Sequence, residues 1–170
     1  YRNKSIHDVL SMTVSEALEF FADQRTILRK LKPLEDVGLG YITLGQSSST
    51  LSGGEAQRVK LAYYLGQENS SQRILFIFDE PTTGLHFHDV RKLLVALNSL
   101  VDKGHTVLVV EHNLEVMKCA DYIIDLGPEA GVNGGQLLYQ GQPEGLPKVK
   151  KSHTGRYLKE KLVVPKTKKR

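Results

Sequence analysis

Several common features are absent or scarce in this chain. The sequence has no tryptophan, one cysteine, Cys119, and no apolar run of the roughly 18 residues that a membrane-spanning helix needs. A single cysteine excludes an internal disulfide and a zinc site held by cysteines alone. No secretory signal is recognisable in the first residues. We therefore expect a cytoplasmic protein with no zinc site in this chain.

A phosphate-binding loop is also missing. Such a loop reads Gly-x-x-x-x-Gly-Lys-Ser/Thr, and its backbone N–H groups and lysine hold the phosphates of a nucleotide. None of the fifteen glycines in this sequence is followed by a lysine. The residues that would bind most of a nucleoside triphosphate are therefore not part of this chain.

What is present is an ordinary globular composition with unevenly distributed charge. Of the 170 residues, 40% are hydrophobic and 25% are charged, which favours one soluble domain with a substantial core. Residues 147–170 contain ten Lys/Arg and one acidic residue. This basic segment can attract nucleic acid through its phosphates, or it can be a solvated terminus whose last residues are disordered. Both interpretations remain open.

The first part of the chain has helical patterns. Thr13 and Glu16 form a capping box before a short helix. Apolar residues at helical spacing predict a second helix over about 24–36, which Pro33 should bend or split. We therefore predict a helical subdomain at residues 1–50.

The middle of the chain reads as a strand, a helix and a strand. Unbroken apolar runs at 73–78 and 106–110 predict two buried strands. The helical pattern at 87–102 lies between them, so the two strands should be parallel. The helix should bury one face, formed by Val90, Leu93, Leu94, Leu97 and Val101. The remaining predicted elements are strands at 121–126 and 136–140 and a helix at 154–162.

Residues 51–55 read Leu-Ser-Gly-Gly-Glu and carry the first functional pattern. Ser52 and Glu55 form another capping box, which places Gly53 and Gly54 in the first turn of a helix that ends near Gly66. Glycines let the backbone approach a ligand closely, and a helix N-terminus offers unpaired N–H groups and a positive dipole end. This arrangement suits a phosphate.

The strands end in the second and third patterns. Asp79 and Glu80 follow the strand at 73–78, and His112 follows the strand at 106–110. The carboxyl ends of neighbouring parallel strands meet at one edge of a sheet, where α/β proteins bind ligands. We therefore expect these three residues at one edge of the sheet.

Together, the three patterns resemble the motifs of ABC-type ATPases, in their order and at their spacing. Residues 51–62 resemble the signature, residues 74–80 the Walker B strand, and His112 the switch histidine. The resemblance implies an α/β fold: the C-terminal half of an ABC-type (P-loop NTPase) nucleotide-binding domain, with a mostly parallel sheet flanked by helices and an N-terminal helical signature subdomain.

Site roles follow from that resemblance. Asp79 would hold the Mg²⁺ of MgATP, Glu80 would orient or deprotonate the attacking water, and His112 would contact the γ-phosphate. The signature would touch a phosphate bound mainly by a partner module, through Ser52, Gly53, Gly54 and Glu55. Glu55 departs from the glutamine that many ABC proteins have. A further loop after the Walker B acids, the D-loop, comprises Gly84, Leu85 and His86.

A narrower resemblance rests on the segment after the Walker B acids. Residues 81–86 read Pro-Thr-Thr-Gly-Leu-His, where transporters usually have Ser-Ala-Leu-Asp in the last four places. This segment is similar to that of the UvrA family, the damage sensors of bacterial nucleotide excision repair. Residues 36–46, 120–128 and 154–158 agree with the same family.

The family resemblance implies a much longer protein with two ABC modules, of which this chain would be the C-terminal part of the second. Residues 51–146 would form half of the ATPase core. The cofactors would be ATP and Mg²⁺, with zinc only in upstream regions. The partners would be damaged duplex DNA, the helicase-like protein UvrB, the other ABC module and a second copy of the protein. Two alternatives stay open: a fragment of a transporter-type or translation-type ABC ATPase, and an ATPase-inactive interaction module.

Overall fold

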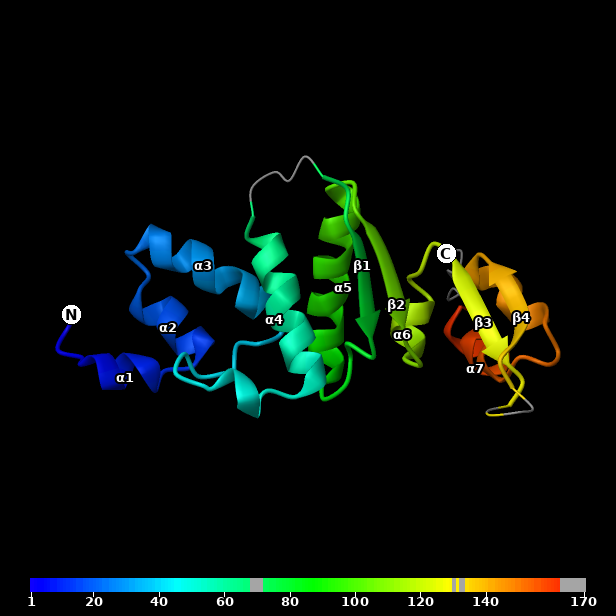
Figure 1. The fold of residues 1–170 in the computed structure, drawn as a ribbon, viewed down its shortest axis with the longest axis horizontal. Coiled ribbons are helices and arrows are strands. Elements are labelled where there is room, and N and C mark those ends of the chain that lie inside the picture. Colours follow the sequence, from blue (N-terminus) through cyan, green and yellow to red (C-terminus); the bar gives the residue numbers. More distant parts are fainter. Residues whose placement is uncertain (68–71, 130, 132–133, 163–170) are drawn as a thin grey trace, which may run out of the picture. The chain divides into compact units, whose positions relative to one another are not determined.

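A computed structural model describes residues 1–67, 72–129, 131 and 134–162. It divides into two compact units, Tyr1–Val110 and Glu111–Arg170. Figure 1 shows the order of the elements along the chain. Part of the loop expected after Gly66, part of the glycine-rich turn at 127–135 and the last residues of the basic segment lie outside the described residues. Within the described part, no helix is both long and apolar enough to cross a membrane.

Three helices begin the first unit. They are α1 (Ile6–Leu10), α2 (Val14–Phe20) and α3 (Arg25–Asp36). The capping box of Thr13 and Glu16 is confirmed at the start of α2. Helix α1 was not predicted, although Ser5 and Asp8 form a capping box there too. Pro33 does not split α3, which runs as one helix and ends before Gly38, where φ is +78°.

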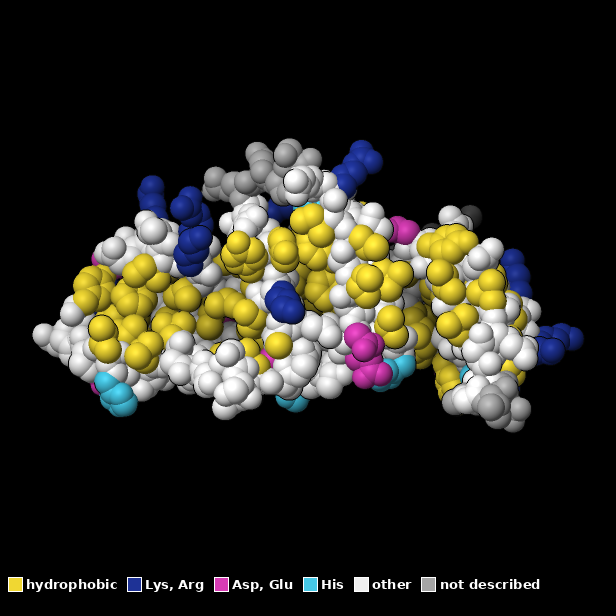
Figure 2. All heavy atoms as spheres, in the orientation of Figure 1, with side chains coloured by type: hydrophobic (Ala, Val, Ile, Leu, Met, Phe, Trp, Pro, Cys, Tyr) yellow, Lys and Arg dark blue, Asp and Glu magenta, His cyan; other side chains and the backbone are white. Residues whose placement is uncertain are grey.

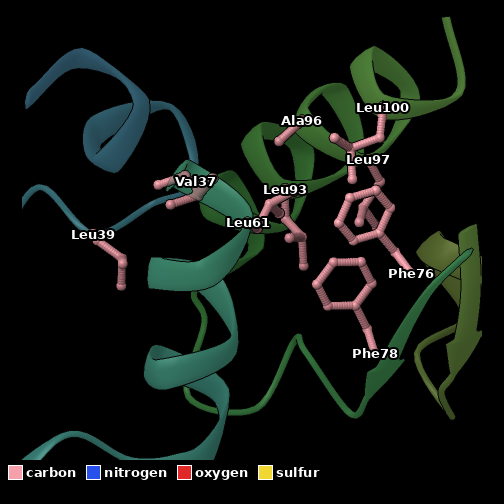
Figure 3. Close-up of a cluster of buried hydrophobic side chains, with 10 residues drawn as sticks. Val37, Leu39, Leu61, Phe76, Phe78, Leu93, Ala96, Leu97 and Leu100 are labelled. Atoms are coloured by element: carbon pink, nitrogen blue, oxygen red, sulfur yellow. The ribbon is translucent and has the colours of Figure 1, made fainter. Parts of the chain in front are cut away.

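The core of the first unit lies between one pair of strands and two helices. The short η1 (Ser48–Thr50) leads into α4 (Gly53–Leu65), followed by β1 (Leu75–Asp79), α5 (Phe87–Asp102) and β2 (Thr106–Val110). Strands β1 and β2 are parallel and in register from Leu75↔Thr106 to Asp79↔Val110, as predicted. Figure 3 shows Phe76 and Phe78 of β1 directed towards α5 and α4, where Leu93 and Leu61 are buried.

The prediction of buried strands holds for one face of this pair only, where Val107 and Val109 of β2 are partly buried against the core. Phe76 and Phe78 are buried, whereas Leu75 and Ile77 are 58% and 65% exposed. On β2, Leu108 and Val110 are exposed as well. Figure 2 shows apolar side chains open to solvent over these strands. Side chains alternate between the faces of a strand, and in the described residues α4 and α5 cover one face alone.

The buried face of α5 also differs slightly from its prediction. Val90, Leu93 and Leu97 are buried as expected, but Leu94 is half-buried and Val101 is 43% exposed. Ala96 and Leu100 complete the buried face instead. The buried stripe of α5 therefore follows the i, i+3, i+4 and i+7 positions counted from Leu93 and does not reach Val101.

The second unit packs a short antiparallel strand pair with small helices. Its elements are α6 (Leu114–Met117), β3 (Ile123–Gly127), β4 (Gln136–Gly141), the 3-10 helix η3 (Pro143–Lys148) and α7 (His153–Lys161). Strands β3 and β4 confirm the predicted positions closely, and a bulge interrupts their register between Asp125 and Leu126. The ion pair between Lys161 and Glu115, at 2.9 Å, joins α7 to α6.

Gly155→Ala is expected to destabilise the chain by about 1–3 kcal/mol, because α7 lies too close to η3 for a side chain at this position. A Cβ atom there would lie 2.5 Å from the backbone oxygen of Leu146. Urea unfolding followed by circular dichroism measures the effect. Gly53→Ala is the control, since a Cβ atom on that glycine meets nothing within 4 Å. Equal midpoints for the two variants would contradict the packing argument.

Candidate functional site

Helix α4 begins with the predicted capping box. Ser52 is the N-cap: its Oγ accepts a hydrogen bond from the Glu55 N–H at 3.3 Å, and Glu55 Oε2 accepts one from the Ser52 N–H at 2.7 Å. The Ser52 side chain also bonds to the Glu55 carboxylate, and this bond contributes to the lowered pKa of Glu55. The cap therefore fixes the start of α4 through bonds in both directions between Ser52 and Glu55.

The two glycines of the signature have different surroundings. Gly53 is exposed, and a Cβ atom there would meet nothing within 4 Å. Gly54 is buried, and a Cβ atom there would lie 3.3 Å from both the Thr83 oxygen and Arg58 Nη1. Gly53 thus presents open backbone to a ligand, whereas Gly54 lets α4 pack against the loop that follows β1.

Glu55 is engaged by two groups of its own unit. Its Oε1 accepts a hydrogen bond from the Tyr41 hydroxyl, and its Oε2 accepts the bond from Ser52. These bonds, that of Tyr41 first, lower the pKa of the Glu55 carboxyl. Burial, followed by the same bond to Glu55, raises the pKa of Tyr41. Whether Glu55 also contacts nucleotide stays a prediction.

Tyr41→Phe is expected to raise the pKa of Glu55 towards its ordinary value, because the largest cause of the lowering is lost. A lowered carboxyl pKa stabilises the fold above the unfolded-state pKa, and this contribution disappears as the pH falls through the folded-state value. The variant should therefore lose stability at neutral pH and approach wild type in acid. NMR titration of the Glu55 side chain measures the shift, and an unchanged pKa would contradict it.

The two Walker B acids lie where the sequence predicts them. Asp79 is the last residue of β1, paired with Val110 of β2, and both Asp79 and Glu80 are exposed. The backbone of Glu80 has φ of +46°, a conformation that costs energy for residues other than glycine. Its N–H donates to the Val110 oxygen at 2.9 Å, which helps to hold this conformation.

The segment at 81–86, which ends in the D-loop, turns tightly from the Walker B acids into α5. The Thr83 N–H bonds to the Glu80 oxygen at 3.1 Å, and the Leu85 N–H bonds to the Thr82 oxygen at 3.0 Å. Gly84 has φ of +77°, which favours glycine. Leu85 packs against the core cluster, and His86 is the N-cap of α5. The D-loop is thus anchored by the partly buried Leu85, which packs against the core.

Two residues that the sequence analysis gave no role join α4 to this loop. The Gln57 side chain donates from Nε2 to the Asp79 oxygen at 3.0 Å and accepts at Oε1 from the Asp79 N–H at 3.1 Å. Arg58 is 1% exposed, and its Nη1 donates to the oxygens of Pro81 at 2.9 Å and Thr83 at 3.4 Å. The sequence shows only that Gln57 and Arg58 follow the signature, and no pattern in it marks the burial of Arg58.

His112 lies in the second unit, two residues beyond the end of β2. Glu111 Oε2 accepts hydrogen bonds from the backbone N–H groups of His112 and Asn113, at 3.0 and 3.1 Å. Asn113 caps α6. The first unit brings the signature, the Walker B acids and the D-loop together, whereas the expected role of His112 beside them stays a prediction.

Comparisons with known proteins agree with this geometry. The UvrABC system protein A of Mycoplasmopsis pulmonis is 61% identical over 162 residues, covering 95% of this chain and 17% of that protein. The same-named protein of Bacillus subtilis is 59% identical over 167 residues, covering 98% of this chain and 17% of that protein. The crystal structure of UvrA2 from Deinococcus radiodurans superimposes with a TM-score of 0.83 at 48% identity, over 96% of this chain and 20% of that one. No family model matches.

The fold and the arrangement of motifs define a segment of an ABC-type nucleotide-binding domain. A bacterial Atm1-family ABC exporter has the same fold, with a TM-score of 0.52 at 21% identity. The higher identities just given place the chain in the UvrA family rather than among transporters. The chain spans about a sixth of the length of these curated relatives.

Proposed function

We propose that this chain supplies the signature, Walker B and switch-histidine residues for ATP binding and hydrolysis in a damage-recognition protein of bacterial nucleotide excision repair. The observation that carries the proposal is the direct attachment of the signature helix α4 to the end of β1. Gln57 bonds to both backbone polar groups of Asp79, so the phosphate-facing helix and the carboxylates form one rigid edge.

The exposed acids fit the metal of a magnesium nucleotide. Mg²⁺ prefers hard oxygen ligands and binds through one or two carboxylates, the substrate phosphates and water. Asp79, at the carboxyl end of β1, offers such an oxygen to the solvent-accessible edge. When bound, the ion would neutralise charge on the phosphates. Asp79 would hold it, and Glu80 would accept a proton from the attacking water.

The open start of α4 fits a phosphate from another module. Gly53 leaves its backbone uncovered, and Ser52 is exposed at the same helix start. Because this sequence has no phosphate-binding loop, we propose ATP turnover for the full-length protein and not for the 170-residue chain alone. The other ABC module, a second copy of the protein, damaged duplex DNA and UvrB are the proposed partners, in the cytoplasm.

Asp79→Asn in the full-length protein tests the proposal. The amide removes one negative charge from the metal site, so about tenfold more Mg²⁺ should be needed for half-maximal ATP turnover. Titration of Mg²⁺ in a steady-state ATPase assay measures this. Asp102→Asn, at an exposed position at the end of α5, is the matched control and should leave the Mg²⁺ dependence unchanged.

The repair function is tested with the same preparation. Wild-type protein should bind a duplex with one bulky lesion more tightly than the undamaged duplex, and nucleotide should change this preference. Fluorescence anisotropy at a fixed salt concentration measures both affinities, because phosphate contacts make binding salt-dependent. Equal affinities under every nucleotide condition would overturn the assignment to damage recognition, and an unchanged Mg²⁺ dependence in Asp79→Asn would overturn the metal assignment.

A further inference from the structure

We propose that Gln57 and Arg58 are positioning residues that set, from the signature helix, the geometry of the Walker B acids and of the loop at 81–83 that leads into the D-loop. This inference rests on the proposed ATP hydrolysis. Neither side chain lies among the residues expected to touch nucleotide. Their bonds end instead on backbone atoms of the segment that carries Asp79 and Glu80.

Gln57 acts at the end of β1 as a neighbouring strand would. Its amide exchanges two hydrogen bonds with the N–H and C=O of one residue, Asp79, at 3.1 and 3.0 Å. Both bonds are satisfied only when Oε1 faces the N–H and Nε2 faces the oxygen, so they fix the amide in one orientation. The backbone of Asp79 is thereby held at the point where the strand leaves the sheet.

The two hydrogen bonds from Gln57 to Asp79 matter because the next residue, Glu80, has a strained backbone conformation. Glu80 has φ of +46°, and such a conformation persists only where the surrounding structure determines it. Gln57 holds the residue before Glu80, and Arg58 donates to the oxygen of Pro81, the residue after it. Two adjacent residues of α4 therefore bracket the residue proposed to activate water.

Arg58 is positioned to hold the loop rather than to add stability. Its charged side chain is 1% exposed, and its Nε donor has no hydrogen-bond partner among the described residues. Burying a guanidinium in this way costs free energy that bonds to loop oxygens only partly offset. Gly54 lies beside the same loop, since a Cβ atom added there would be 3.3 Å from the Thr83 oxygen. Movement of the signature helix would thus be transmitted to the D-loop and to Glu80.

The experiment uses the full-length protein, with the equivalent glutamate of the other ABC module replaced so that only this site turns over. Gln57→Leu keeps the size of the side chain and removes both bonds. We expect kcat to fall about 10- to 100-fold while ATP affinity changes less than about twofold, because misplacement slows the chemical step and leaves the phosphate contacts intact. Lys60→Leu, at an exposed position of the same helix, should leave both values unchanged.

A double variant separates positioning from other effects. If Gln57 acts through Glu80, Gln57→Leu added to Glu80→Gln should lower kcat no further than Glu80→Gln alone. A kcat of the double variant that is lowered by the product of the two single losses would overturn the inference. A wild-type kcat in Gln57→Leu would also overturn it. Turnover that survives Glu80→Gln would instead overturn the proposed function. Should Gln57→Leu fail to fold, Gln57→Glu keeps the acceptor and loses the donor, and the same kcat loss is required of it.

The role of Arg58 is tested by two substitutions, of which one is conservative. Arg58→Lys keeps the charge but offers one donor atom, and Arg58→Met removes the donors altogether. We expect kcat to fall in the order wild type, Arg58→Lys, Arg58→Met, with ATP affinity nearly constant. Equal kcat values for the two variants and wild type would overturn the role of Arg58 in holding the loop that leads into the D-loop.

Discussion

Glu80→Gln in the full-length protein is expected to lower ATP turnover at this site by about 100-fold or more and to leave the nucleotide bound. Glu80 is exposed at the carboxyl end of β1, next to the carboxylate proposed to hold Mg²⁺. The glutamine keeps the size of the side chain but cannot accept a proton from water at neutral pH. Phosphate binding depends on other groups, so affinity should persist.

The measurement needs only this site to be active. With the equivalent glutamate of the other module replaced, steady-state phosphate release reports turnover here, and equilibrium binding of a fluorescent ATP analogue reports affinity. Glu144→Gln, at an exposed position of η3 in the second unit, is the matched control and should behave as wild type. Loss of ATP affinity as large as the loss of turnover would mean that Glu80 supports the fold of the site instead of its chemistry.

Local patterns in the sequence predicted the elements that carry the site. The capping box of Ser52 and Glu55, the parallel pairing of β1 with β2 and the position of Asp79 at a strand end all follow from short-range rules. These features depend on residues close in sequence or on a single crossover. They could therefore be derived before any packing was known.

Features that depend on contacts between distant residues were not predicted. The bonds from Gln57 and Arg58 join positions more than twenty residues apart, and no periodic pattern marks them. The exposed outer side chains of β1, such as Ile77, were expected to be buried because an unbroken apolar run looks the same in either case. The different surroundings of Gly53 and Gly54 likewise appear only once the D-loop is in place.

Gly53→Leu is the variant that tests whether the signature acts across modules. Gly53 is exposed, and a Cβ atom there would meet nothing within 4 Å, so a side chain can leave the backbone without a clash. In the presence of Glu80→Gln, the remaining turnover comes from the other site, which the signature is proposed to face. We expect Gly53→Leu to lower that turnover by about 100-fold, because the leucine blocks backbone donors from the phosphate. Gly54 is a poorer choice, since a side chain there would press on Thr83 and Arg58 of its own unit.

The same variant is also tested with the other module's site inactive. When the other module's glutamate is replaced and Glu80 is intact, turnover occurs at this chain's own Walker B acids. Gly53→Leu should then change it less than about twofold, because that site would use the signature of the other module. Gly54→Ala should lower turnover in this same background, since its Cβ atom would lie 3.3 Å from the Thr83 oxygen, just before the D-loop. A large loss with Gly53→Leu here, and none in the presence of Glu80→Gln, would show that the signature serves its own module.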